Sequence, residues 1–240
     1  MLNDYLGEPT YIMGIGNIFP IRIKDIEKFR EISSTCLIIG KETIKNRLKL
    51  DIEYLMDFYL ANNEKFYDDF KKLLELSLRE DIEIIVKTCE NGDEEIGFRV
   101  KDKSFEINRY NFEIFREVCM KQNLLYEPRT EKNDLLQEWL ELARETKMRA
   151  TEEVDIESIC QLVAVYKGIS PFELKEYTYY QLIAEYSRIT IIDAQGYVML
   201  LRSQGVDEKI PTTSKKIDLY KNPDDDLVKI ENQSPKGKSL

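Results

Sequence analysis

The sequence contains no histidine among its 240 residues. Histidine is the side chain whose unperturbed pKa lies near neutral pH, and this makes it the usual general base in enzymes. Its absence excludes Ser-His-Asp triads, Cys-His dyads and zinc sites with imidazole ligands. An enzyme would have to use carboxylate, lysine or tyrosine side chains, and the sequence shows no motif for such chemistry. We therefore expect a protein that is not an enzyme and that holds no cofactor or metal ion.

Cysteine is also scarce, and the four cysteines are widely spaced, with no CxxC pair. This spacing excludes a Cys₄ zinc site, and scattered unpaired thiols fit a reducing compartment. The N-terminal stretch MLNDYLGEP lacks the basic and apolar regions of a secretory signal. No apolar run is long enough to cross a bilayer. We expect the protein to remain inside the cell.

Positive charge is in the minority, since 35 Lys and Arg residues stand against 45 Asp and Glu residues, a net charge of -10. The sequence has no run of Lys and Arg that would build a local basic patch. Nucleic acids and anionic membranes bind basic surfaces, so neither is an expected partner. Glycine and proline are few as well, with ten and seven residues, which favours long regular elements over a strand-rich sandwich.

The apolar patterns predict an α+β protein that is predominantly helical, with a small antiparallel β-meander and hairpin sheet. Residues 10–23 are typical of a hairpin, because apolar runs flank Gly14-Ile15-Gly16-Asn17. A phosphate-binding GxGxxG loop is the less favoured alternative, since Phe19 stands where its third glycine is required. Residues 82–108 predict a three-stranded meander whose first turn contains Asn91-Gly92.

Helical spacing predicts the first set of helices. Residues 26–33 begin a helix that ends at Gly40, and residues 41–80 continue as further helices. Asn108 is the predicted N-cap of a helix that contains Phe112 and Cys119.

A second set of helices is predicted after residue 131. The first of them carries Leu135, Leu136 and Leu142 beside the chain's only tryptophan, Trp139. The next ends at Gly168, a plausible C-cap. The last covers about residues 178–203, and Gly196 is the place where it could break.

Composition divides the chain into three parts. Residues 1–128 form a mixed α/β region, residues 129–204 form a helical region, and residues 205–240 form a flexible or extended C-terminal tail. The tail contains Asp224-Asp225-Asp226. We interpret this run as solvated rather than as a cation site, because no EF-hand glycine or closing glutamate stands at the required offset.

The segment ISPFELKEYTYYQLIAEY, residues 169–186, holds five aromatic rings. Ser170-Pro171-Phe172-Glu173 is a predicted capping box with proline at the first helical position. Three interpretations of the aromatic stripe are open: a helix core, a protein-docking groove or a small-molecule box. Core packing is favoured, because a stripe at spacings of three and four is typical of a buried helix face.

Three stretches of the chain resemble proteins of phages from low-GC Gram-positive bacteria. The N-terminal YLGEPTYIMGIGNIFPIRIKDIEKF is similar to a hairpin that leads through a proline into a first helix. The middle FEINRYNFEIFREVCMKQNLL resembles their strand-then-helix segment, with Asn-Phe before the helix and Gln-Asn after it. The late GISPFELKEYTYYQLIAEYSR resembles the closing helices of phage tail assembly chaperones.

This resemblance implies a non-enzymatic protein of the bacterial host cytoplasm. Such chaperones coat the tape measure protein and deliver it to the growing tail tube. The expected partners are the tape measure, tube or baseplate subunits of the tail, with homo-oligomers as a further option. The aromatic helix is the expected protein-binding site, through Phe172, Tyr179, Tyr180 and Tyr186.

Two other functions remain open. A structural tail or baseplate component would stay in the assembled particle, and its extended C-terminal arm would order on neighbouring subunits. An enzyme that depends on carboxylates or tyrosine is the least favoured, and an acidic cleft with strongly shifted carboxylate pKa values would revive it.

Overall fold

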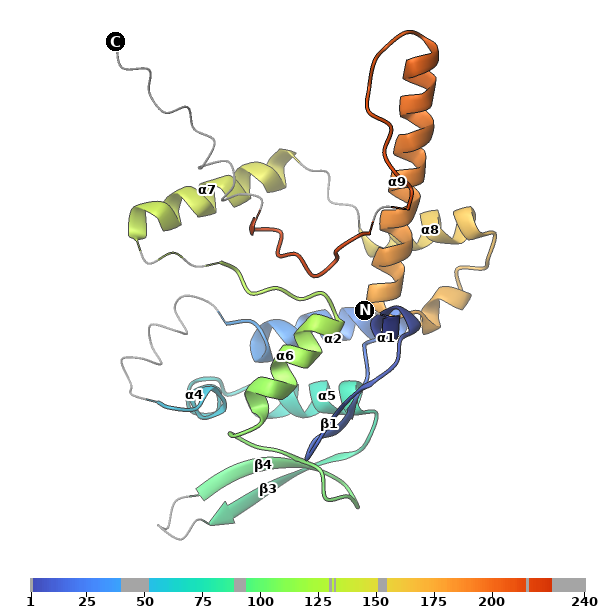
Figure 1. Ribbon diagram of the computed structural model, residues 1–240. Helices are drawn as coiled ribbons and strands as arrows, with labels where there is room; N and C mark the ends of the chain where they lie inside the picture. The colour runs from blue at the N-terminus through green and yellow to red at the C-terminus, as the bar shows by residue number, and fades with distance from the viewer. Residues whose placement is uncertain are drawn as a thin grey trace, which may run out of the picture.

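The computed structural model describes residues 2–39, 52–88, 94–129, 131, 133–150, 155–214 and 216–225. A mixed α/β body occupies the N-terminal half, and a helical part follows it, from which one long helix projects (Figure 1). Helices predominate over two small antiparallel sheets, and this confirms the predicted α+β class.

The first sheet is the predicted N-terminal hairpin. It pairs β1 (Thr10–Ile12) with β2 (Gly16–Ile18) in antiparallel register. Gly16 has a φ of +99°, and a Cβ at this position would lie 3.0 Å from the ring of Phe105. Any other residue would strain both the backbone and this contact. The turn geometry therefore explains the glycine at position 16 without a phosphate-binding loop.

The larger core lies between the hairpin, the second sheet and the helices of the N-terminal half. Phe70 is fully buried near its centre, with its ring centroid 4.9 Å from that of Phe98 and 5.2 Å from that of Phe112. Aromatic pairs at such spacings add to the stability from buried area. The helices of this half are α1 (Leu2–Leu6), η1 (Ile23–Asp25), α2 (Ile26–Cys36), α4 (Leu55–Asn62), α5 (Phe66–Leu78) and α6 (Phe112–Gln122).

The predicted meander is the second sheet. Its strands β3 (Ile82–Thr88), β4 (Glu94–Val100) and β5 (Glu106–Ile107) pair in sequence order, each antiparallel to the next. Phe98 on the central strand is fully buried against the core. The predicted turn at Asn91-Gly92 lies outside the described residues.

The C-terminal half forms a second, smaller hydrophobic cluster. Its elements are α7 (Asp134–Ala150), α8 (Ile156–Lys167), η2 (Glu173–Glu176) and α9 (Tyr179–Ser203). α8 packs on the first half of α9, and the distal half of α9 projects from the body (Figure 1). The buried members of the cluster are Ile159, Val163, Ala164, Leu174, Leu182 and Ile189.

Several helix boundaries differ from the predictions. α9 continues through Gly196 without a break. Asn108 does not cap α6, because its side chain accepts a hydrogen bond from the Tyr110 N–H at 3.0 Å and so closes the preceding turn. Gly168 does end α8, with a φ of +64°. The predicted C-cap at Gly40 and the helical residues 41–51 lie outside the described residues.

After α9 the chain turns back toward the body (Figure 1). The Arg188 side chain donates to the Thr213 carbonyl, and further along the Tyr126 hydroxyl donates to the Leu219 carbonyl. We call residues 216–225 the C-terminal strap. The domain limits at residues 128 and 204 remain predictions.

Candidate protein-binding surface

Two side-chain caps shape the aromatic segment. The Glu173 carboxylate accepts a hydrogen bond from the Ser170 N–H at 3.0 Å, as predicted, but the turn that follows is the short 3₁₀ helix η2. A second, reciprocal cap lies eight residues later. Thr178 Oγ1 accepts from the Gln181 N–H at 3.1 Å, and Gln181 Oε1 accepts from the Thr178 N–H at 2.8 Å. This second capping box starts α9.

The four aromatic residues predicted to bind protein lie in separate surroundings. Phe172 is 74 % exposed on η2. Tyr179 packs against the larger core, and Tyr186 packs against the smaller cluster. Tyr180 is buried, with its ring centroid 5.5 Å from that of Tyr220 on the strap. The structure therefore does not gather these rings into one exposed patch, and their role in binding remains a prediction.

Backbone hydrogen bonds join the start of α9 to the N-terminal body. The Tyr179 N–H donates to the Ile21 carbonyl at 3.1 Å, and the Ile23 N–H donates to the Tyr177 carbonyl at 2.9 Å. Tyr179 is thus part of the junction between the two halves. Packing at this junction accounts for an aromatic residue at position 179 without a bound ligand.

An ion pair reinforces this junction. The Glu176 carboxylate accepts from Lys24 Nζ at 2.8 Å and from the Arg22 guanidinium. The hydrogen bond from Lys24, together with the positive charge of Arg22, lowers the pKa of Glu176 below its usual value. Because these side chains are largely exposed, we assign them a positioning role rather than a large share of the stability.

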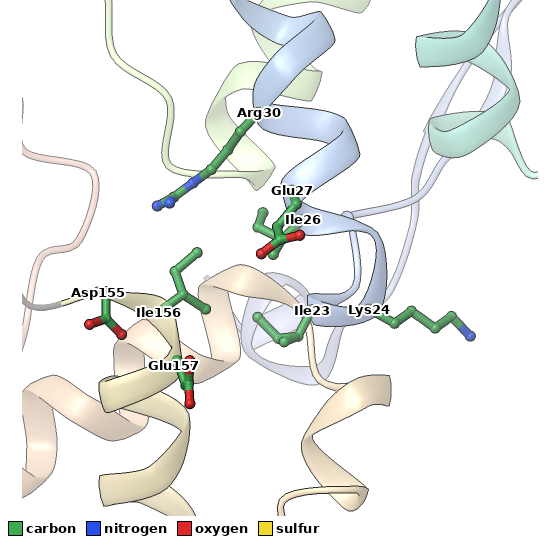
Figure 2. Close-up of a pocket in the computed structure, with 8 residues that line it drawn as sticks. All are labelled: Ile23, Lys24, Ile26, Glu27, Arg30, Asp155, Ile156 and Glu157. Atoms are coloured by element: carbon green, nitrogen blue, oxygen red, sulfur yellow. The ribbon is translucent and has the colours of Figure 1, made fainter.

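An open hollow of about 520 Å³ lies between the N-terminal ends of α2 and α8. Figure 2 shows Arg30 extending from α2 toward the hollow, the Ile156 side chain near its middle and Lys24 pointing away. The lining residues are Ile23, Lys24, Ile26, Glu27, Arg30, Asp155, Ile156 and Glu157.

Two polar side chains of this hollow, Asp155 and Arg30, already have structural partners. Asp155 caps α8 by accepting from the Ser158 N–H at 2.6 Å, and this hydrogen bond lowers the pKa of Asp155. Arg30 donates to the Tyr179 hydroxyl at 3.4 Å, and its guanidinium lies 5.6 Å from the centre of that ring. The eight lining residues include no nucleophile paired with a base. We therefore assign no catalytic step to this hollow.

An exposed apolar helix face of the C-terminal half lies on α7. Its exposed fractions are 61 % for Leu135, 59 % for Trp139, 56 % for Leu142 and 40 % for Leu136. Leu135, Trp139 and Leu142 follow each other at spacings of four and three, so they share one side of the helix. We call these four residues the α7 apolar face. Exposed apolar surface gathered on one side of a helix is a feature of many interaction sites.

The opposite side of α7 is the side that the protein covers, and it is largely polar. Gln137 and Leu140 are each 6 % exposed, and Gln137 Oε1 accepts from the Glu131 N–H at 2.8 Å. One turn further on, Arg144 contacts the strap. An amphipathic helix in a monomeric protein normally buries its apolar side. α7 does the reverse, because the groups that hold it are hydrogen bonds and an ion pair.

Asp224 of the strap is the main anchor of α7. Arg144 Nε lies 3.1 Å from Asp224 Oδ1 and 3.2 Å from Asp224 Oδ2, and the Arg129 N–H donates to the same carboxylate at 3.0 Å. The hydrogen bond from Arg144 lowers the pKa of Asp224. The interpretation of this acidic run as solvated is therefore wrong for Asp224, whose side chain is 13 % exposed. Asp226 lies outside the described residues.

Sequence reasoning identified the apolar residues of α7 but not their exposure. One sequence feature could have indicated the exposure. Gln137, Leu140 and Arg144 follow each other at spacings of three and four, so the helix has a second side that is largely polar and that can be held by hydrogen bonds. Periodicity alone does not show which side of a helix is covered.

Neither a metal cluster nor a membrane span is found in the described parts of the chain. No three His, Cys, Asp or Glu residues there are placed to hold a metal ion. No helix in those same stretches combines the length and apolar character needed to cross a bilayer.

Residues 146–218 match the family described as YomV second domain, a stretch that contains α8, η2 and α9. The chain is also similar to the SPbeta prophage-derived uncharacterized protein YomV of Bacillus subtilis (strain 168). The two are 25% identical over 224 residues, which cover 90% of this chain and 88% of the relative. No solved structure matches. These similarities support a phage-derived protein, and neither of them concerns tail assembly.

Proposed function

We propose that this protein is a non-enzymatic phage assembly protein, and specifically a tail assembly chaperone that binds the tape measure protein in the host cytoplasm. The observation that carries the proposal is the orientation of helix α7, whose polar side is covered and whose apolar side is exposed. Its polar side is held by the strap, and its apolar face, which includes Trp139, is open to a partner. Tryptophan is enriched among the residues that contribute most to binding, so Trp139 is the expected anchor.

The absence of histidine from the sequence supports a binding role. In the hollow between α2 and α8, Asp155 is engaged in a helix cap and Arg30 in a hydrogen bond to Tyr179. The similarity to a prophage-derived protein supports the phage setting. The tape measure, tube and baseplate proteins of the same phage are the candidate partners, and nucleic acids and membranes are not.

The second candidate is a structural tail or baseplate component that stays in the particle. The distal half of α9 favours it. Residues 190–203 contain no buried side chain, and their apolar side chains Tyr197, Met199 and Leu200 are each more than half exposed. A helix that is apolar all round is normally buried, and permanent interfaces are more apolar than transient ones. A neighbouring tail subunit or a second copy would cover this half in the particle.

Co-expression with the tape measure protein of the same phage tests the first proposal. The triple variant Leu135→Ser, Trp139→Ser, Leu142→Ser should lose most of the copurifying tape measure protein, because each side chain removed is exposed in the free chain. Met13→Ser is the matched control, since Met13 is 89 % exposed on the hairpin. Equal copurification with the triple variant and the control would refute binding through α7.

Mass spectrometry of infected-cell lysate and of purified particles separates the two candidates. A chaperone should be abundant in the lysate and absent from finished particles. A structural component should be present in particles at a fixed ratio to the tube protein. The second outcome would replace the chaperone proposal.

A further inference from the structure

The larger sheet has an open edge. Its strand order is β3-β4-β5, so β3 and β5 are its outer strands. The β5 side meets the hairpin, because the Glu106 N–H donates to the Gly14 carbonyl at 3.0 Å. Within the described residues no strand pairs with the outer side of β3, which lies at the lower end of the molecule in Figure 1. The open edge is therefore the whole of β3, Ile82–Thr88.

A hydrogen bond at the start of the sheet shows which residues of β3 face outward. The Lys101 N–H donates to the Asp81 carbonyl at 2.9 Å, so these two residues form a hydrogen-bonded pair of the β3–β4 ladder. Hydrogen-bonded and non-hydrogen-bonded pairs alternate along an antiparallel ladder. The odd-numbered residues of β3 therefore bond to β4, and the even-numbered ones point their N–H and C=O groups away from it. These outward-facing residues are Ile82, Ile84, Val86 and Thr88.

β3 is a regular and largely apolar edge strand. It contains no proline, and its pairing with β4 runs through all seven residues without a bulge. Ile84 is 42 % exposed and Val86 is 59 % exposed. Proline, bulges and short length are common means of protecting a sheet edge, and an apolar edge that lacks them is a surface for pairing with another strand.

We propose that β3 pairs antiparallel with β3 of a second copy of this chain, about a twofold axis at Ile85. The two sheets would then form one continuous sheet. Because only outward-facing groups can bond across the edge, even-numbered residues must pair with even-numbered ones. An axis at Ile85 meets this condition, pairs each strand over its full length and sets Ile84 opposite Val86 of the second copy. The inference goes beyond the proposed function and does not depend on the tape measure protein.

Opposite charges meet in this register. Glu83 is exposed, forms no ion pair with another described residue, and would lie opposite Lys87 of the second copy. Lys87 Nζ also binds the Glu106 carboxylate of its own chain, at 2.7 and 2.8 Å, and its side chain is 48 % exposed. An ammonium group has three donors, so Lys87 can keep Glu106 and still bind Glu83 of the second copy. A shift of register by two residues would lose this pair and shorten the paired strands.

A hollow beside the edge has room for side chains of the second copy. It has a volume of about 590 Å³, lies between β3 and α5, and is lined in part by Ile82 and Ile84. In the twofold register Val86 of the second copy would lie opposite Ile84 and cover it. Burial of such apolar surface favours association.

The mass of the protein in solution tests the inference. Sedimentation velocity at high micromolar concentration should give about twice the mass of the 28.3 kDa chain. Val86→Pro should give the mass of a single chain, because proline removes an N–H that points outward and leaves the bonds to β4 in place. Val86→Thr keeps the N–H and the branched side chain, and should remain a dimer. Circular dichroism checks that each variant is folded.

A cysteine crosslink tests the register itself. In a background of Cys89→Ser and Cys160→Ser, Ile85→Cys should form a disulfide-linked dimer on oxidation, because its two copies would face each other with Cα atoms about 4.5 Å apart. Glu83→Cys is the matched control on the same face of the same strand. Its two copies would lie about 13 Å apart, beyond the reach of a disulfide.

A parent protein with the mass of a single chain would overturn the inference. A dimer that persists in folded Val86→Pro, together with no crosslink in Ile85→Cys, would place the interface elsewhere and overturn it as well. Equal crosslinking of Ile85→Cys and Glu83→Cys would refute the twofold register. If Val86→Pro does not fold, the crosslinking pattern of the two cysteine variants decides.

Discussion

At the scale of single residues, two buried amides tie α6 to the N-terminal hairpin. Asn123 is 1 % exposed, its Oδ1 accepts from the Ile21 N–H at 2.8 Å, and its Nδ2 donates to the Cys119 carbonyl at 2.7 Å. Gln122 Nε2 donates to the Ile18 carbonyl at 3.1 Å. This Gln-Asn pair is part of the resemblance to phage proteins. Its role in the structure is to hold the fold.

Asn123→Ala should lower the free energy of unfolding by about 2 kcal/mol, because the Ile21 N–H would stay buried without its acceptor. Urea denaturation measures the loss. Asn17→Ala is the control, since Asn17 is exposed on the hairpin and its removal should change stability by less than about 0.5 kcal/mol. Equal losses in the two variants would contradict a special role for Asn123.

The thiols of the described residues should differ in reactivity. Cys36 and Cys119 are buried, and burial raises the pKa of each thiol to about 12. Cys160 is only half-buried, although burial raises its pKa as well. Because the thiolate is the reactive form, iodoacetamide at pH 8 should modify Cys160 first, and the other two only on unfolding. Peptide mapping that found Cys119 modified early would show that the core opens locally.

At the scale of elements, the orientation of α7 depends on the strap. The folded-state pKa of Asp224 lies below the ordinary value of 3.8 for this carboxyl, chiefly because of the hydrogen bond from Arg144. The ion pair therefore stabilises the docked strap fully above about pH 3.8. This contribution is lost as the pH falls through the lower, folded-state pKa.

Asp224→Asn should release the strap even at neutral pH. Hydrogen exchange at the Arg129 amide, which donates to Asp224, should become faster in the variant. In the parent protein the same amide should lose protection when the pH is lowered below about 3.8. Asp218→Asn is a nearby control, because Asp218 makes only a local contact with the Tyr220 N–H among the described strap contacts. Unchanged exchange in Asp224→Asn would show that other contacts hold α7.

At the scale of the whole molecule, the two hydrophobic clusters are separate. The larger one is centred on Phe70 and its aromatic neighbours, and the smaller one lies between α8 and α9. The two meet at the junction of residues 21–24 with 176–179, where two backbone hydrogen bonds and an exposed ion pair join them, and Ile156 packs against both clusters.

Phe70→Ala should cost about 3–5 kcal/mol, because it leaves a cavity among Phe66, Phe98 and Phe112. The loss should appear as faster hydrogen exchange in α5 and α6, while α8 and the first half of α9 keep most of their protection. Mass spectrometry of exchanged peptides measures both parts in one sample. Equal loss of protection in both clusters would show that they unfold as one unit.

Much of the fold could be predicted from local patterns. The hairpin, the meander, the C-cap at Gly168 and the extent of α9 follow from turn residues and apolar spacing, which act between near neighbours. The cap at Asn108 was mispredicted, because a short polar side chain can close a turn as readily as it can cap a helix. The continuity of α9 through Gly196 shows the limit of propensity, since one glycine costs a long helix only about 1 kcal/mol.

The candidate binding surface could not be predicted in the same way. The predicted aromatic residues are divided among the junction, the strap contact and the smaller cluster, and Phe172 alone of the four is mostly exposed. In the sequence, the apolar spacing of α7 is that of an ordinary amphipathic helix whose apolar side is buried. Its exposure follows from Arg144 and Asp224, which are 80 positions apart in the chain.

The sequence by itself determined many of the elements that form and the absence of histidine-dependent chemistry. Apolar spacing, caps and turns are properties of neighbouring residues, and the lack of histidine is a property of composition. The tertiary structure alone decided which face of each helix is covered. Which face is covered depends on contacts between residues far apart in the chain, such as those of the strap with α7. Local sequence patterns do not predict such contacts.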